Sequence, residues 1–168
     1  MKRIWSPWRY GYITGAKPAN CVFCQLIQDN NDKENLILYR GEQCYIMLNR
    51  YPYTNGHLMV IPYQHTDSSL SLSNAALTEM MILNNLGIAA LTDAMHPDGF
   101  NIGMNLGKSA GAGIKEHIHL HIVPRWTGDN NFMPVIGKTR VINQSLEDCY
   151  SVLLPIITRL SQEKIKPK

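Results

Sequence analysis

Half of the six histidines in this chain stand at alternate positions, His117, His119 and His121, within the stretch EHIHLHIVPRW. On an α-helix, side chains two residues apart point to nearly opposite sides, whereas on a β-strand they lie on the same face. A strand therefore makes the three imidazoles neighbours and directs the bulky aliphatic residues between them into a core on the other face. We predict such a strand, with the histidines gathered on one face of a sheet.

Two kinds of chemistry suit three neighbouring imidazoles. They could hold a catalytic zinc ion, although side chains four residues apart on a strand are separated by about 13 Å, which makes chelation by all three awkward. Alternatively, one neutral imidazole could attack phosphorus, provided that an acceptor holds its other nitrogen and that hydrogen-bond donors neutralise the phosphate. The stretch GKSAGAG at residues 107–113 supplies glycines, which let backbone amides approach phosphate oxygens. Arg125 could reach a phosphate or form a surface salt bridge. An exposed strand whose histidines have no role is the plainest alternative.

The composition is that of an ordinary soluble domain, with 45% apolar and 17% charged residues. We expect one domain over residues 1–168, with an N-terminal arm at 1–20 and a frayed tail at 161–168. No uninterrupted apolar run has the length of a membrane span, and the N-terminus lacks the apolar segment of a signal peptide. We therefore expect a cytoplasmic protein without a membrane partner. The net charge of +3 suits small phosphate-bearing molecules and does not by itself indicate nucleic acid.

Changes in the period of the apolar residues predict the elements that must position the histidines. The long helix can be capped by Ser73 or Asn74, and Pro155 is a difficulty for the continuity of the last helix. The predicted elements are a polar loop at 28–35, strands at 36–39, 44–48, 57–62, 100–105 and 116–122, and helices at 73–95 and 145–160. Antiparallel strands with one long helix indicate an α+β fold, in which the helix covers one sheet face and the other face is left for a site or a partner.

The stretch HIHLHIV resembles the signature of the histidine triad family of nucleotide hydrolases and transferases, and LNRYPYTNGHLMVIPYQH and NIGMN resemble the family's flanking segments. The stretches IWSPWRYGYI, CVFC and PRWTGDNNFMPVIGKTRV are similar to the bacterial branch that resembles diadenosine tetraphosphate phosphorylases and hydrolases. The likeness covers nearly the whole chain. It implies about five antiparallel strands with one long helix on a face and a C-terminal helix, and a homodimer formed through sheet and helix.

The resemblance also implies roles for individual residues. The catalytic residues it implies are His119 as nucleophile, His121 in contact with phosphate, and His57 and His117 beside them. The substrate-binding residues it implies are Asn49 at the ribose, Asn105 near the phosphate, and the loop positions Ser109, Gly111 and Gly113.

The implied reaction is cleavage at the α-phosphorus of an adenosine-containing nucleotide, such as a diadenosine polyphosphate, through a nucleotidyl-histidine intermediate. Water as acceptor makes the enzyme a hydrolase, and inorganic phosphate makes it a phosphorylase. No organic cofactor is expected. The alternatives are a nucleoside phosphoramidate hydrolase, a metallohydrolase with its metal on the triad, and a nucleotide-binding module without catalysis.

Cys21 and Cys24 form a CxxC pair. In a reducing compartment such a pair is more often metal-binding or redox-active than a structural disulfide. Zinc takes four nitrogen or sulfur ligands, so two more are needed. The resemblance implies that His65 and His117 complete a structural zinc site. The alternative is two reduced, buried cysteines with His65 on the surface.

Overall fold

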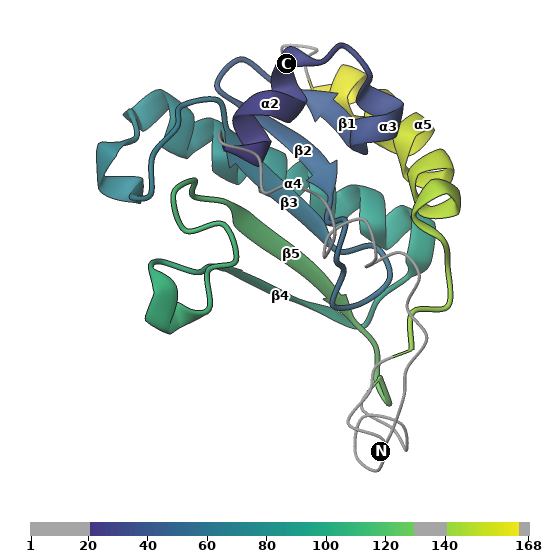
Figure 1. Cartoon of the computed structure of the whole chain (residues 1–168). Helices are drawn as coiled ribbons and strands as arrows, with labels where there is room; N and C mark the ends of the chain where they lie inside the picture. Colours follow the sequence, from purple (N-terminus) through teal and green to yellow (C-terminus); the bar gives the residue numbers. More distant parts are fainter. Residues whose placement is uncertain (1–20, 130–140, 165–168) are drawn as a thin grey trace.

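Five strands form one antiparallel sheet in the order β1-β2-β3-β5-β4 (Figure 1). The computed structural model describes residues 21–129 and 141–164, so the arm predicted at 1–20 lies outside the described residues. The strands are β1 (Ile37–Arg40), β2 (Cys44–Leu48), β3 (Leu58–Pro62), β4 (Gly99–Met104) and β5 (Leu120–Arg125). The predicted α+β class and the antiparallel sheet are confirmed.

Helices α4 (Asn74–Met95) and α5 (Leu146–Lys164) pack against each other and cover the same face of the sheet, behind it in Figure 1. The predicted cap is confirmed, because the Ser73 side chain accepts a hydrogen bond from the Ala76 N–H. Gly87 lets α4 approach the sheet closely, since a Cβ at this position would lie 2.8 Å from Cδ1 of Ile122.

The buried face of α4 differs from the apolar positions that are most evident in the sequence. Leu77 and Met81 recur at helical spacing but are 36% and 52% exposed, because Met80, Leu83 and Leu86 face the core instead. By length and composition α4 could cross a membrane, yet its buried side chains pack against the sheet and against α5 in the main core.

Helix α5 continues through Pro155 and reaches Lys164, four residues into the segment predicted as a tail. A proline inside a helix costs about 3 kcal/mol. Leu153 and Ile157 on either side of it are fully buried, and each such side chain contributes roughly 1.5–3 kcal/mol by leaving water. Core packing therefore keeps the helix intact.

Two short helices occupy the region before β1, where a polar loop was predicted. Helix α2 (Val22–Gln28) begins directly after Cys21 and contains Cys24, and α3 (Asp32–Asn35) is a single turn capped by the Asn31 side chain. The prediction of a loop at 28–35 was wrong because one side-chain cap suffices for a four-residue helix. Phe23 of α2 packs on the sheet face opposite α4, in a second core cluster with Ile37, Tyr45, Met47, Met59 and Ile61.

The strand that carries the histidines begins later than predicted. β5 starts at Leu120, and the segment before it is held by a hydrogen bond from the Ile118 N–H to the Thr66 carbonyl, 2.7 Å long. The predicted alternation is nevertheless confirmed for the apolar residues, because Ile118, Leu120 and Ile122 all lie in the core under α4 and α5. His119 lies on the other face, against the ring of Phe23.

Candidate active site and metal cluster

Three histidines meet on the sheet face that α4 and α5 do not cover. His57 comes just before β3, His119 comes just before β5 and His121 lies in β5, so β3–β5 pairing brings together residues far apart in the sequence. The rings of His119 and His121 are 4.7 Å apart between centroids, and those of His57 and His121 are 5.1 Å apart. All three side chains are buried, with at most 8% exposed.

The hydrogen bond of His119 determines which of its nitrogens carries the proton. Nδ1 lies 2.8 Å from the backbone carbonyl of His117. A carbonyl only accepts, so Nδ1 is the protonated nitrogen and Nε2 keeps its lone pair. Burial lowers the pKa of His119, and the carbonyl partly opposes this effect. The ring is therefore neutral near pH 7 and has the form that a nucleophile needs.

In His121 the proton is on the other ring nitrogen, Nε2, and a hydrogen bond from His57 determines this. The Tyr53 backbone N–H donates to Nδ1 of His57 over 3.1 Å, so His57 carries its proton on Nε2. That Nε2 donates to Nδ1 of His121 over 2.9 Å, which leaves the His121 proton on its own Nε2. Burial and the neighbouring histidines lower the pKa of His57 to about 3 and that of His121 to about 4. The site thus offers a lone pair on His119 and a proton donor on His121.

Nε2 of His121 is buried and has no hydrogen-bond partner within residues 21–129 and 141–164. An unpaired buried donor is costly, by about 1–3 kcal/mol. Such a group is typical of a position where a ligand supplies the acceptor.

The predicted substrate-binding residues divide into two groups. Nδ2 of Asn49 lies 3.3 Å from Nδ1 of His57, and Asn105 lines a cavity beside His121. The glycine-rich loop instead projects from the end of β4, where Ser109, Gly111 and Gly113 are exposed. The structure therefore brings both asparagines to the histidines and leaves the three loop residues on the surface.

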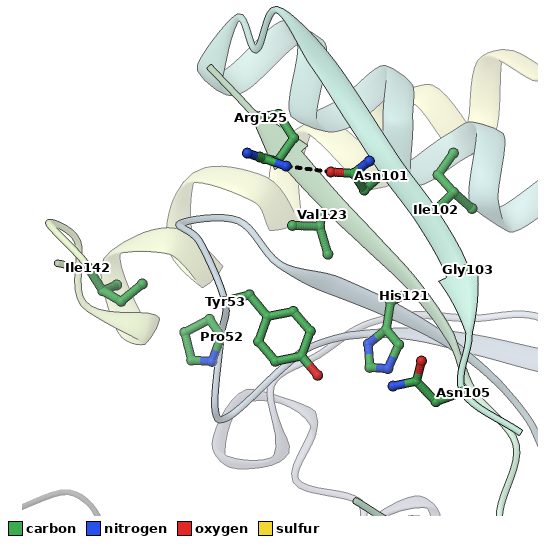
Figure 2. A pocket seen from close by; sticks show the side chains of 10 residues that line it. All are labelled: Pro52, Tyr53, Asn101, Ile102, Gly103, Asn105, His121, Val123, Arg125 and Ile142. Atoms are coloured by element: carbon green, nitrogen blue, oxygen red, sulfur yellow. Dashed lines mark hydrogen bonds between the residues drawn. The ribbon is translucent and has the colours of Figure 1, made fainter. Parts of the chain in front are cut away.

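The cavity beside His121 has a volume of about 570 Å³ and opens on the same face of the sheet (Figure 2). Tyr53 and Asn101, which were not predicted as site residues, line it. Asn101 stands opposite Val123 in the β4–β5 ladder, and this pairing has no signal in the sequence. The lining residues are Pro52, Tyr53, Asn101, Ile102, Gly103, Asn105, His121, Val123, Arg125 and Ile142.

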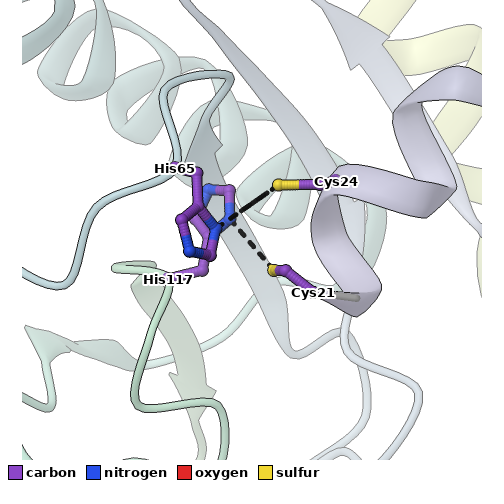
Figure 3. A group of neighbouring side chains, drawn as sticks. All are labelled: Cys21, Cys24, His65 and His117. Atoms are coloured by element: carbon purple, nitrogen blue, oxygen red, sulfur yellow. Dashed lines mark hydrogen bonds between the residues drawn. The ribbon is translucent and has the colours of Figure 1, made fainter. Parts of the chain in front are cut away.

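The four predicted metal ligands lie together around His117, the first of the three alternating histidines (Figure 3). One ligand atom from each of Cys21, Cys24, His65 and His117 lies within 4.8 Å of all the others. Nδ1 of His117 lies 3.3 Å and 3.6 Å from the two sulfurs, and Nδ1 of His65 lies 3.4 Å from Sγ of Cys24.

These distances fit a tetrahedral zinc site. Zn–S bonds of about 2.3 Å and Zn–N bonds of about 2.0–2.1 Å place neighbouring nitrogen and sulfur ligands about 3.6 Å apart. His117 is also in the required tautomer, because its Nε2 donates to the Pro62 carbonyl over 2.9 Å and its Nδ1 lone pair faces the sulfurs. The donor set and its geometry are compatible with a structural zinc ion.

His117 belongs to both groups of residues. Its ring belongs to the candidate metal-binding group of two cysteines and two histidines, and its backbone carbonyl accepts the hydrogen bond from His119. The position of the His117 ring in this group is therefore coupled to the position of the His117 carbonyl, which orients the His119 imidazole.

Comparisons with known proteins agree with this geometry. The model of the HIT domain matches residues 30–128. The "AP-4-A phosphorylase" of Mycobacterium tuberculosis (strain H37Rv) is 39% identical over 163 residues, which cover 91% of this chain and 83% of that protein. A zinc-bound histidine triad family protein from Mycobacterium smegmatis superposes with a TM-score of 0.69 at 28% identity, covering 86% of this chain and 97% of that one. A hypothetical histidine triad nucleotide-binding protein from Sulfolobus tokodaii has a TM-score of 0.70 at 28% identity, with coverage of 88% and 99%. The chain therefore belongs to the histidine triad family, with its HIT domain at residues 30–128.

Proposed function

We propose that this protein cleaves diadenosine tetraphosphate or a similar dinucleoside polyphosphate at the α-phosphorus, with His119 as nucleophile and transient carrier of the nucleotidyl group. The observation that carries the proposal is the hydrogen bond from Nδ1 of His119 to the His117 carbonyl, because it leaves Nε2 unprotonated. The substrate class is supported by the similarity to the mycobacterial AP-4-A phosphorylase over most of both chains.

In the first step, the Nε2 lone pair of His119 forms a bond to the α-phosphorus. The bond from phosphorus to the bridging oxygen breaks, and that oxygen leaves with the electron pair at the end of the remaining polyphosphate. The ring becomes cationic and keeps its Nδ1 proton on the His117 carbonyl. The Nε2–H of His121 donates to a phosphoryl oxygen, and one such donor is worth roughly 100- to 1,000-fold in rate.

In the second step, an acceptor attacks the α-phosphorus, the N–P bond breaks and its electron pair returns to Nε2 of His119. Inorganic phosphate as acceptor yields a nucleoside diphosphate. Water as acceptor yields a nucleoside monophosphate and releases a proton. We propose phosphate as the acceptor, on the strength of the name of the mycobacterial relative.

The proposal includes a structural zinc ion held by Cys21, Cys24, His65 and His117. A bound ion would link α2 to the segment before β5 and fix the peptide whose carbonyl holds His119. The zinc-bound family member from Mycobacterium smegmatis supports this assignment. We further propose that residues 1–168 form one domain and that the protein works in the cytoplasm, where reducing conditions keep the thiols free.

A homodimer is also proposed. β4 is an edge strand, and edge strands with apolar side chains favour pairing with another chain. Ile102 of β4 is 45% exposed, and Met81 and Ile82 of α4 are 52% and 53% exposed. Light scattering on the purified protein tests this point, and a monomeric mass at micromolar concentration would contradict it.

The test of the reaction is a rapid quench with diadenosine tetraphosphate labelled at the α-phosphate, with and without inorganic phosphate. We expect label trapped on the wild-type protein and not on His119→Ala, and discharge as ADP when phosphate is present. His96→Asn is the matched control, because His96 lies at the exposed end of α4 with a positive φ that asparagine tolerates. Absence of both trapped label and turnover would overturn the proposal.

A further inference from the structure

We infer that the cavity beside His121 is a subsite for the second nucleoside of the substrate, the one that leaves with the polyphosphate. This inference rests on the proposed function. We call the part of the cavity beyond His121 the distal subsite, formed by Pro52, Tyr53, Asn101, Val123, Arg125 and Ile142.

The distal subsite is continuous with the reacting centre. His121, Val123 and Arg125 alternate along β5 and so point to the same face. Four strand positions span about 13 Å, which leaves room for bridging phosphates near His121 and for a nucleoside farther along. The unpaired Nε2 of His121 lies at the near end of this groove and supplies a donor for the first phosphates.

The neighbouring strand keeps the groove open. In the β4–β5 register, Gly103 stands opposite His121 and Gly99 stands opposite Arg125. A Cβ at either glycine would meet no atom within 4 Å, so these positions contribute free space and no side chain. The loop between β2 and β3 forms one wall with Pro52 and Tyr53, whose ring lies beside His121 in Figure 2.

The chemistry of the lining suits a nucleoside better than a run of phosphates. Tyr53 is 48% exposed and presents an aromatic surface on which a base can stack. Asn101 supplies an amide of the kind that pairs with the edge of adenine. Val123 and Ile142 add apolar surface.

The charge at the far end supports the same assignment. Arg125 is the cation among the lining residues, and its guanidinium is already paired with both carboxylate oxygens of Asp129. It also donates to Oδ1 of Asn101 over 2.6 Å. A guanidinium neutralised in this way orients the asparagine and does not present a free charge to an anion.

The test compares diadenosine tetraphosphate with adenosine 5′-tetraphosphate, which has the same phosphate chain without the second nucleoside. We expect wild-type protein to favour the dinucleotide in kcat/KM by roughly five- to tenfold. This factor lies at the lower end of what stacking of a base on an aromatic ring contributes, because the Tyr53 ring is half exposed. Tyr53→Ala should bring this ratio close to one, whereas Tyr53→Phe, which keeps the ring, should retain it. Asn101→Ala provides a second variant that does not alter the loop, and it should lower the ratio as well.

Tyr51→Ala is the matched control, because Tyr51 is an exposed tyrosine of the same loop that does not line the cavity. Its ratio should equal that of wild type. Equal turnover of both compounds by wild type, or a ratio unchanged in both Tyr53→Ala and Asn101→Ala, would overturn the subsite and leave the proposed function intact. Turnover of neither compound would overturn the proposed function and the subsite together.

Discussion

We propose that His57 acts on the reaction through its hydrogen bond to His121, and replacing His57 tests the assignment of protons in the site. In His57→Leu, the donor to Nδ1 of His121 disappears, so the proton of His121 can move from Nε2 to Nδ1. The Nε2 of His121 then carries a lone pair, as the Nε2 of His119 already does. That nitrogen would then repel phosphate oxygens instead of donating to them. We expect kcat to fall by roughly 100- to 1,000-fold, the effect of losing one well-placed donor.

The same substitution should also destabilise the protein. It removes the 2.9 Å bond to His121 and the 3.1 Å bond from the Tyr53 N–H, and it leaves a buried nitrogen of His121 without a partner. At about 1–3 kcal/mol for each of the two groups left unsatisfied, the free energy of unfolding should fall by about 2–6 kcal/mol. Urea unfolding measures this loss, and single-turnover rapid quench in the cold measures the chemistry on folded protein.

Two further variants separate positioning from simple loss of stability. His57→Gln carries an amide N–H that can donate to His121, so its kcat should recover to within about tenfold of wild type. Gly87→Ala should lose about 1–2 kcal/mol by crowding Ile122 at the helix–sheet contact, yet keep its kcat. A folded His57→Leu protein with wild-type kcat would refute the reasoning about the tautomer of His121.

Three other predictions concern stability. The Glu79 carboxylate accepts hydrogen bonds from the backbone N–H groups of residues 42–44, so Glu79→Gln should cost about 2–4 kcal/mol in urea unfolding, whereas the exposed Glu42→Gln should change little. His57 has a folded pKa of about 3 and an unfolded pKa of about 6.5, so the unfolded state binds more protons and stability falls as the pH drops below about 6.5. The slope from this residue should approach 1.4 kcal/mol per pH unit, and equal urea midpoints near pH 7 and pH 5 would contradict it. Removal of zinc by a chelator, or Cys24→Ala, should lower the melting temperature, and added zinc should restore it only in the wild type; a melting temperature indifferent to the chelator would exclude a structural ion.

Local patterns in the sequence predicted the features that depend on one segment at a time. The alternation from His117 to Ile122 identified the two faces of the triad segment, and the helical period with its Ser73 cap identified α4. Features that depend on pairing between distant segments were not predictable in the same way. Tyr53 and Asn101 meet at one cavity only because β4 pairs with β5 and the β2–β3 loop folds beside them.

The start of β5 and the helix α3 show a second limit. Whether a residue before Leu120 belongs to β5 depends on the hydrogen-bond partner of its backbone. The N–H of Ile118 donates to the Thr66 carbonyl, which lies outside the strands. α3 depends on one side-chain cap from Asn31. Such differences involve single hydrogen bonds of about 1 kcal/mol, which composition and periodicity do not resolve.

In the segment from Ile118 to Ile122, residues that pack in the core alternate with residues of the candidate active site. Even-numbered positions are packed under α4 and α5, whereas His119 and His121 stand on the opposite side. A saturation scan of this segment would therefore show two kinds of loss that alternate with a period of two. Polar substitutions at positions 118, 120 and 122 would remove the protein from the soluble fraction of cells, whereas substitutions at 119 and 121 would abolish activity with a smaller loss of abundance. Measurements of abundance and activity for the same variants would thus show which side chains of this segment face the core and which face the site, without a structure determination.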